Sequence, residues 1–297
     1  MPHIGAIIVA MCLILLSLQQ HPDLPLIIAA NRDEFYSRPS TAAHFWPDHP
    51  NILAGRDNQA GGTWLGVSRK GRFAAVTNVR GTADKDDQSA QISRGELTRK
   101  FLTTDISAAN YIAQLQEKQH SYAGFNLLLG QLSKSEQKLF YHSNRPPTSQ
   151  TSGNAPRELS CSAHRLGRGS CKLSPGTYGL SNGTLNEAWP KVAQGKQALE
   201  EAINPQQPLQ TKQLAAILWD QQTAEDQHLP HTGISIEQER LLSSRFIRSE
   251  FYGTRSSTVL MLNNNGRIDF YEKTFLYDEQ DSNRNKHIIE QHFTLEP

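Results

Sequence analysis

The fold expected of this chain is decided by Cys12-Leu-Ile-Leu-Leu-Ser-Leu18, by the turn His21-Pro22-Asp23, and by Leu26-Ile-Ile-Ala-Ala30, which runs into Asn31-Arg32-Asp33-Glu34. Both apolar runs are short and rich in branched residues, and turn residues separate them. This pattern is typical of two buried, neighbouring strands. Polar residues that directly follow a buried strand lie at the edge of a sheet, where functional sites usually form. We therefore expect a site at this edge.

Hairpin and helix patterns continue on the C-terminal side of this stretch. A hairpin is expected around Lys70-Gly71, and a second one closes the chain through Asn264-Asn265-Gly266. Strands are also expected at 125–130, 138–142 and 179–182, helices from a capping box at Ser93 and Glu96 to Leu102 and at 107–119, 189–203 and 212–219, and an exposed loop at 146–156. Strands at both ends of the chain with grouped helices predict one layered α/β domain. The hairpin connections favour antiparallel sheets.

Composition and charge narrow the classes of function. The chain has 297 residues, of which 37% are hydrophobic and 20% charged, and its net charge is +1. A surface for nucleic acid or anionic lipid needs concentrated basic charge, which this balance does not indicate. The apolar run Ile4–Leu18 lacks a basic segment and a small-residue cleavage site, and it is too short to span a bilayer. We expect no nucleic-acid partner and no membrane span.

The cysteines predict neither a disulfide scaffold nor a metal site. There are three, Cys12, Cys161 and Cys171, and they are few and unevenly placed. No Cys-x-x-Cys pair occurs, and two cysteines with His164 fall short of a closed zinc site. The segment around Cys161 and Cys171 is rich in Gly and Ser, which indicates a surface insertion. The cysteine content predicts a reducing, cytoplasmic location.

A collinear series of short motifs resembles the Asn-Arg-Asp-Glu (NRDE) family of transport and Golgi organisation 2-like proteins. One such motif would be weak, but a series in the same order over most of the chain is strong. The motifs are Met11-Cys12, Ala29-Ala30-Asn31-Arg32-Asp33-Glu34-Phe35, Gly61-Gly62-Thr63-Trp64-Leu65-Gly66, Thr77-Asn78-Val79-Arg80, Gly124-Phe125-Asn126-Leu127, Tyr178-Gly179-Leu180-Ser181-Asn182, Trp189-Pro190-Lys191 and Tyr252-Gly253-Thr254-Arg255.

This family resembles, more distantly, the cysteine N-terminal-nucleophile (Ntn) hydrolases. That resemblance implies a four-layer αββα sandwich with antiparallel sheets, and it implies a set of site residues. The positions that match are Cys12, Arg32, Asp33, Asn78, Asn182 and Arg255. The spacing leaves two positions open: Glu34 is an alternative to Asp33 for the acidic residue, and Arg245 is an alternative to Arg255 for the late arginine.

An N-terminal nucleophile uses the α-amino group of its own first residue as the base. A free α-amine has a pKa of about 7.7–8.0 and a thiol about 8.5, so both titrate near neutral pH. Arg32 would favour the thiolate, Asp33 would hold the protonated amine, and Asn78 and Asn182 would donate to the oxyanion. Each of these residues also has a structural interpretation, as a buried thiol, an ion-pair cluster or a strand end.

The scheme requires Cys12 to be the first residue, yet eleven residues precede it. A translation start at Met11 followed by methionine removal would expose Cys12, and self-cleavage of a short propeptide is the alternative. We therefore expect residues 1–11 to be an extension absent from the working protein. Residues 12–297 form the single domain.

The sequence supports more than one function. The first is an amidohydrolase that cleaves a non-peptide C–N bond of a small-molecule substrate through Cys12. The resemblance also implies haem handling by a non-enzymatic protein, with haem as a ligand, although no Cys-x-x-Cys-His motif occurs. A third possibility is a hydrolase scaffold without chemistry. The sequence does not predict the substrate or the oligomeric state.

Overall fold

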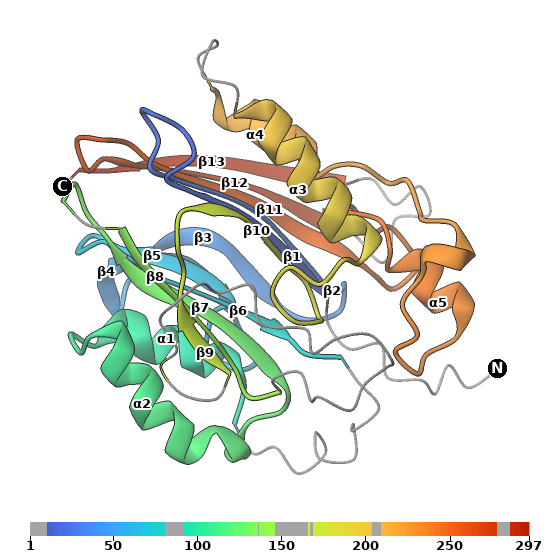
Figure 1. Cartoon of the computed structure of the whole chain (residues 1–297), viewed down its shortest axis with the longest axis horizontal. Coiled ribbons are helices and arrows are strands. Elements are labelled where there is room, and N and C mark those ends of the chain that lie inside the picture. The colour runs from blue at the N-terminus through green and yellow to red at the C-terminus, as the bar shows by residue number, and fades with distance from the viewer. Residues whose placement is uncertain are drawn as a thin grey trace.

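Two antiparallel sheets lie face to face in the structure (Figure 1), a computed structural model that describes residues 11–80, 92–135, 137–145, 166, 169–203, 209–277 and 286–296. Within these residues the first sheet has six strands, in the order β10 (Gly176–Leu180), β1 (Cys12–Leu18), β2 (Leu26–Phe35), β11 (Tyr252–Leu262), β12 (Ile268–Tyr277) and β13 (Lys286–Leu295). The second, described over the same ranges, has seven: β3 (Ser40–Trp46), β4 (His49–Asp57), β5 (Leu65–Ser68), β6 (Arg72–Asn78), β7 (Phe125–Leu132), β8 (Gln137–Ser143) and β9 (Ser170–Lys172).

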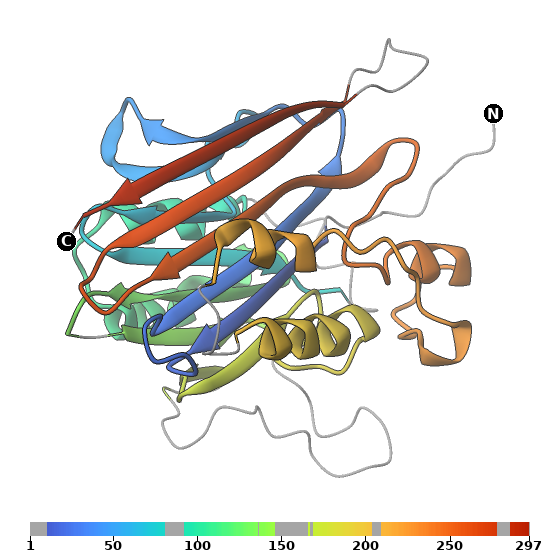
Figure 2. The same ribbon diagram turned by 90° about the horizontal axis from the view of Figure 1, so that it is seen from above.

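Helices cover the outer face of each sheet. The second sheet is covered by α1 (Gly95–Thr103) and α2 (Ala108–Lys118), and the first by α3 (Pro190–Ala202) and α4 (Thr211–Ile217), as Figures 1 and 2 show. A short α5 (Ile236–Leu241) lies beyond the end of the first sheet, and 3-10 turns occur at Gln119–Ser121 and Asp226–His228. The expected four-layer αββα sandwich with antiparallel sheets is confirmed.

The apolar run of β1 is buried on both faces, and its side chains alternate between two cores. Ile14 and Leu16 pack between the sheets, whereas Leu13 and Leu15 pack beneath α3 and α4. Because a strand covered on both faces needs no polar residues, its sequence is a continuous apolar run rather than an alternating one. The same alternation continues through β2.

The first sheet joins the two ends of the chain. β2 pairs with β1 on one side and with β11 on the other, so the N-terminal hairpin lies beside strands from the C-terminal part. Both predicted hairpins are confirmed: β5 and β6 pair around Lys70-Gly71, and β11 and β12 pair through the Asn264-Asn265-Gly266 turn. The sequence analysis missed β3, β4, β9 and β13, and the part of the expected surface insertion that contains Cys171 is the buried strand β9. The segment His49–Asp57 contains Pro, Asn and Gly, which favour turns, and only pairing with β3 and β5 makes it a strand.

The predicted capping box at the start of α1 is wrong. The helix begins at Gly95 after Arg94, one residue later than expected, and no side chain caps it. Ser93 contributes its backbone carbonyl, which accepts from the Glu96 N–H at 3.0 Å. The Glu96 carboxylate instead pairs with Arg99 one turn along the helix, at 2.5 Å, which removes it from the helix start.

Some expectations concern residues that the structure does not describe. The predicted loop at 146–156, Cys161 and His164 lie outside the described residues, as do residues 1–10 of the expected extension. Cys171 is described: it is buried in the core between the sheets and is disulfide-bonded, a bond that the cysteine count did not predict. No helix in the described part of the chain is long and apolar enough to cross a membrane.

Two glycines with the same backbone conformation test how tightly the β5–β6 turn is built. Gly71 and Gly61 have φ values of +72° and +71°, but a Cβ at Gly71 would lie 1.9 Å from the carbonyl oxygen of Leu132, whereas one at Gly61 has nothing within 4 Å. We expect Gly61→Ala to cost about 1–2 kcal/mol of unfolding free energy, the usual strain of a left-handed alanine. Gly71→Ala should cost about 1–3 kcal/mol more from the clash.

Urea denaturation of the two variants and the wild type measures these costs. Equal losses for Gly61→Ala and Gly71→Ala would show that the turn relaxes freely away from Leu132.

Candidate functional site

Cys12 is the first residue of β1 and carries the free thiol among the cysteines that the structure describes. It lies directly opposite Arg32 of β2, and the side chains of directly opposed residues point to the same face of a sheet. That face is the one on which Ile14 and Ala30 pack between the sheets. The Cys12 and Arg32 side chains therefore share the inner face, at the end of the first sheet.

The main chain of Cys12 is held by residues that follow β10. The side-chain oxygen of Asn182 accepts a hydrogen bond from the Cys12 N–H at 3.4 Å, and the Ser181 hydroxyl donates to the Cys12 carbonyl oxygen at 2.8 Å. The amide nitrogen of Asn182 donates to the main-chain carbonyl oxygen of Asn78 at 2.9 Å. The structure thus brings Cys12, Asn78 and Asn182 together, with the Asn182 oxygen, rather than its nitrogen, toward Cys12.

Asp33 lies on the opposite face of β2 from Arg32. One carboxylate oxygen accepts from the Thr254 hydroxyl at 2.7 Å, and the other is buried with no hydrogen-bond partner among the described residues. The Asp33 main-chain N–H donates to the Met11 carbonyl oxygen at 2.8 Å, which places Asp33 beside the Met11–Cys12 peptide bond. Burial raises the pKa of Asp33 to about 6, although Lys191 and the Thr254 hydrogen bond lower it.

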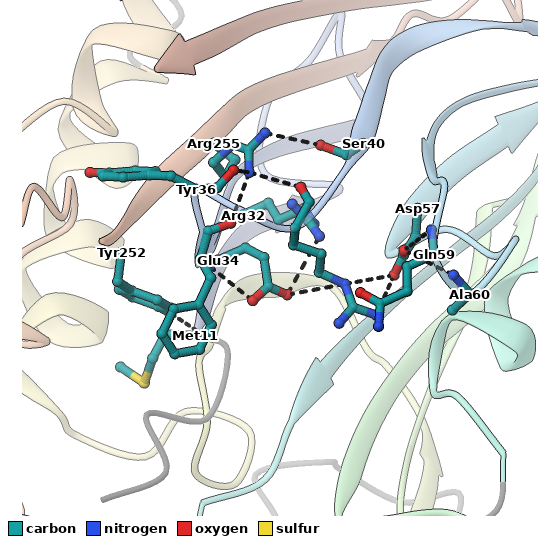
Figure 3. Close-up of polar contacts among 12 residues, drawn as sticks. Met11, Arg32, Glu34, Tyr36, Ser40, Asp57, Gln59, Ala60, Tyr252 and Arg255 are labelled. Carbon is teal, nitrogen blue, oxygen red and sulfur yellow. Dashed lines mark hydrogen bonds and ion pairs between the residues drawn. The ribbon is translucent and has the colours of Figure 1, made fainter. Parts of the chain in front are cut away.

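Glu34 belongs to a different group of charges. It forms an ion pair with Arg32 at 3.5 Å and a second with Arg38 at 3.7 Å, and Arg38 pairs with Asp57 at 2.8 Å (Figure 3). Strand alternation separates the two acids, because Asp33 faces the helical layer and Glu34 lies with Arg32 on the other side. Glu34 is therefore placed to orient Arg32, and Asp33 is placed to contact the main chain at Cys12.

The two late arginines have different partners. Arg255 binds backbone carbonyl groups, and Arg245 binds a carboxylate. One guanidinium nitrogen of Arg255 donates to the carbonyl oxygens of Phe35, Tyr36 and Arg38 at 2.8, 3.0 and 3.1 Å (Figure 3). Arg255 thereby fixes the turn that follows the NRDE motif. Arg245, whose side chain is mostly buried, pairs with Asp220 at 2.5 Å. Arg255 is the one that touches the segment carrying Glu34.

Asn31, the first residue of the motif, is structural. Its amide nitrogen donates to the carbonyl oxygens of Leu218 and Arg245 at 2.8 and 2.7 Å, and its oxygen accepts from Ser257 at 2.6 Å. These bonds fix the end of α4 and the segment before β11 to the centre of the sheet.

The sequence analysis missed Lys191 as a site residue. Its side chain is buried, and its Nζ has no hydrogen-bond partner among the described residues. Burial lowers the pKa of Lys191 to about 8, and the charges of Asp33 and Cys12 act against that fall. One sequence feature does single it out: Lys191 follows Pro190 in the first turn of α3, where the helix dipole disfavours a cation.

A buried ion pair lies next to Lys191. Arg80 contacts Glu239 of α5 at 3.0 Å, and its guanidinium lies 4.9 Å from the centre of the Trp189 ring. The Arg80 N–H also donates to the Asn182 carbonyl oxygen at 2.8 Å. The motifs that contain Asn78, Asn182 and Lys191 therefore meet around Cys12 from three parts of the chain.

The Cys12 thiol is buried behind Met11. Met11 is fully buried against Leu242, Ile247 and Tyr252, and its N–H donates to the Tyr252 hydroxyl at 2.5 Å. Burial raises the pKa of the Cys12 thiol to about 12 and Asp33 adds to the rise, while Arg32 opposes it. A thiol with a pKa raised in this way is protonated at neutral pH.

The chain is similar to known proteins over most of its length. The family model described as Transport and Golgi organisation 2 matches residues 11–277. The chain is 34% identical over 270 residues to the mouse Transport and Golgi organization 2 homolog, covering 87% of this chain and 89% of that protein. It is 36% identical over 262 residues to the human homolog, covering 84% and 87%. A solved structure, the Caenorhabditis elegans N-acylethanolamine-hydrolyzing acid amidase ortholog, aligns with a TM-score of 0.46 and 9% identity over 86% of this chain and 93% of that chain.

The raised pKa of Asp33 predicts the pH dependence of stability in the chain that retains residues 1–11. The folded state binds this proton more tightly than the unfolded state, so Asp33 lowers the free energy of unfolding as pH rises from about 4 to about 6. Asp33→Asn removes this loss. Relative to wild type, the variant should gain up to about 3 kcal/mol over that window, since one pKa unit is worth about 1.36 kcal/mol.

Asp57→Asn is the matched control with the opposite sign. Partial burial raises the pKa of Asp57, but the hydrogen bonds from Arg38 and from the Ala60 and Gln59 N–H groups, with the charge of Arg38, together outweigh it, and the net pKa is lowered. Asp57→Asn should therefore lower the free energy of unfolding at neutral pH, and it should lower it by less in acid, where the Asp57 carboxylate becomes protonated. Denaturation at pH 4 and pH 7 measures both variants, and an Asp33→Asn effect of the same size at the two pH values would contradict the assignment.

Proposed function

Because this chain belongs to the Transport and Golgi organisation 2 family, we propose that it acts as an N-terminal-cysteine amidohydrolase once residues 1–11 are removed. Its nucleophile is Cys12, and its reaction is hydrolysis of a non-peptide C–N bond in a small molecule. The observation that carries the proposal is the buried Asp33 oxygen without a donor, beside the peptide bond that processing would break.

Removal of Met11 supplies the missing donor. A peptide nitrogen has one N–H, and that of Cys12 is directed at Asn182 at 3.4 Å. A free α-ammonium group has three, so it can donate to Asn182 and to the unpartnered Asp33 oxygen together. A buried carboxylate without a donor is costly, and this pairing removes the cost. The match to the family model also begins at residue 11.

The same change activates the thiol. Loss of Met11, which packs over the end of β1, exposes Cys12 to solvent and so reduces the desolvation that raises the pKa of its thiol. The new ammonium adds a positive charge next to the sulfur. Arg32, directly opposite on the same face, adds another and favours the thiolate further.

The reaction then proceeds in two balanced steps. The Cys12 thiol gives its proton to its own α-amine, and the thiolate attacks the amide carbonyl carbon to form a tetrahedral oxyanion. The C–N bond breaks, the leaving amine takes the proton from the α-ammonium, and a thioester remains on Cys12. Water, deprotonated by the α-amine, hydrolyses the thioester to a carboxylic acid and restores the thiol. We assign an oxyanion donor to the side-chain amide of Asn78. The sequence analysis gave Asn182 the same role, but the Asn182 nitrogen donates to the Asn78 carbonyl oxygen and its side-chain oxygen faces the Cys12 N–H.

The processed terminus can be tested without knowing the substrate. We expect the native protein to have an intact mass that begins at Cys12. It should react with 2-cyanobenzothiazole, which condenses with a 1,2-aminothiol and so labels only an N-terminal cysteine. Cys12→Ala should lose this label and any amidase turnover. A main species that begins at Met1 and does not react with 2-cyanobenzothiazole would contradict the mechanism.

Haem handling stays a prediction that rests on the resemblance alone. Titration of the purified chain with haem, followed by visible absorption, tests it independently of Cys12. A spectral change that is retained in Cys12→Ala would favour a carrier over a hydrolase.

A further inference from the structure

Lys191 is a buried cation that has no role in the hydrolase mechanism proposed above. Its side chain comes from the first turn of α3, which packs on β1 and β10. It is 1% exposed, and its ammonium has no hydrogen-bond partner among the residues that the structure describes. A buried cation without a partner destabilises a fold, and such groups are retained mainly where they serve a function.

The charges that face Lys191 come from four different elements. Asp33 of β2 and Glu239 of α5 attract it, the Cys12 thiolate of β1 would also attract it, and Arg80 after β6 repels it. Glu239 is already paired with Arg80 at 3.0 Å, and its second oxygen accepts from Thr232. Asp33 is different, because its second oxygen has no partner in the described part of the chain. Of the charges around Lys191, that of Asp33 acts on it most strongly, and the unpartnered Asp33 oxygen is free to interact with a further cation.

An α-amine that acts as a base must be held in place by a carboxylate and must also remain neutral enough to accept a proton, and these two requirements conflict. The carboxylate of Asp33 orients the amine, but a negative charge at contact distance also stabilises its protonated form and raises its pKa. An amine that stays protonated cannot accept the thiol proton. A second cation on the same carboxylate reduces that effect, because the negative charge is shared between two positive groups.

We propose that Lys191 is a positioning residue that shares the Asp33 carboxylate with the α-amine of Cys12 and so keeps this amine neutral, and able to accept a proton, near pH 7. This inference rests on the proposed function, since it needs the free amine. Lys191 acts through Asp33 and does not itself contact the reacting atoms. Its charge lowers the pKa of both the amine and the thiol of Cys12, so loss of the charge raises both.

The effect of Lys191 on the pKa of the Cys12 thiol is measured by the pH dependence of Cys12 alkylation with iodoacetamide. We expect Lys191→Met, which keeps the length of the side chain and removes its charge, to move the midpoint of the pH–rate profile upward by about one to two units. Lys191→Arg retains the charge and should keep the wild-type midpoint. Lys196→Met, on the same helix, is the control for loss of a lysine that is half-buried and away from Asp33. Asp33→Asn should move the midpoint downward.

Stability separates this role from a purely structural one. Because Lys191 is buried without a partner, Lys191→Met should unfold at or above the wild-type temperature. A variant that no longer folds would show that Lys191 is a structural ion-pair partner and would overturn the proposal. So would a folded Lys191→Met chain with an unchanged midpoint.

Labelling with 2-cyanobenzothiazole distinguishes failure of this inference from failure of the proposed function. If the wild type takes the label and Lys191→Met leaves the midpoint where it was, the role of Lys191 is wrong and the hydrolase mechanism stands. If the wild type takes no label, there is no free amine for Lys191 to act on, and both are overturned.

Discussion

β2 pairs with β1 along one edge and with β11 along the other, and this double pairing determines where the charged residues of the NRDE motif lie. It sets Cys12 directly opposite Arg32 and places Thr254 opposite Asp33. Register in a buried strand is strongly specified, because a shift of one residue would move every apolar side chain to the wrong core. The register of the polar end of β2 is fixed by the same pairing. Arg32 and Asp33 of the NRDE motif therefore point to opposite faces of the sheet.

The two faces have different chemistry. On the inner face Arg32 and Glu34 begin a series of ion pairs that runs through Arg38 to Asp57 near the surface. On the outer face Asp33 is buried with Lys191 in a region of low dielectric, where unpartnered charge is costly. In the proposed mechanism, the inner series orients the side chain that favours a thiolate, and the two charges on the outer face act on the main-chain nitrogen of Cys12. The proposed nucleophile, whose amine and thiol belong to one residue, would use both faces at once.

The buried charges around Cys12 are more than the fold requires. One carboxylate oxygen of Asp33, the ammonium of Lys191 and one nitrogen of Arg32 are buried in the described chain without hydrogen-bond partners. Apolar residues of similar size would pack the same volume at lower cost. At the Met11–Cys12 junction, the α-ammonium of the proposed mechanism would supply a donor for the Asp33 oxygen. Stability given up at one place in a well-packed sandwich is typical of a functional site.

The sequence by itself determined the buried hairpin, the antiparallel layers and the meeting of Cys12 with the NRDE motif, because period, turn residues and apolar runs act locally. It could not determine that Pro- and Gly-containing residues 49–57 form a strand, since pairing with both neighbours overrides their propensity. It also left Asp33 and Glu34 equivalent, as adjacent acids differ only in the face of the sheet to which they point. Lys191 lies 158 residues from Asp33 in the sequence, and only the packing of α3 on β1 makes them neighbours. The roles of these charges depend on burial and distance, which are properties of the tertiary structure.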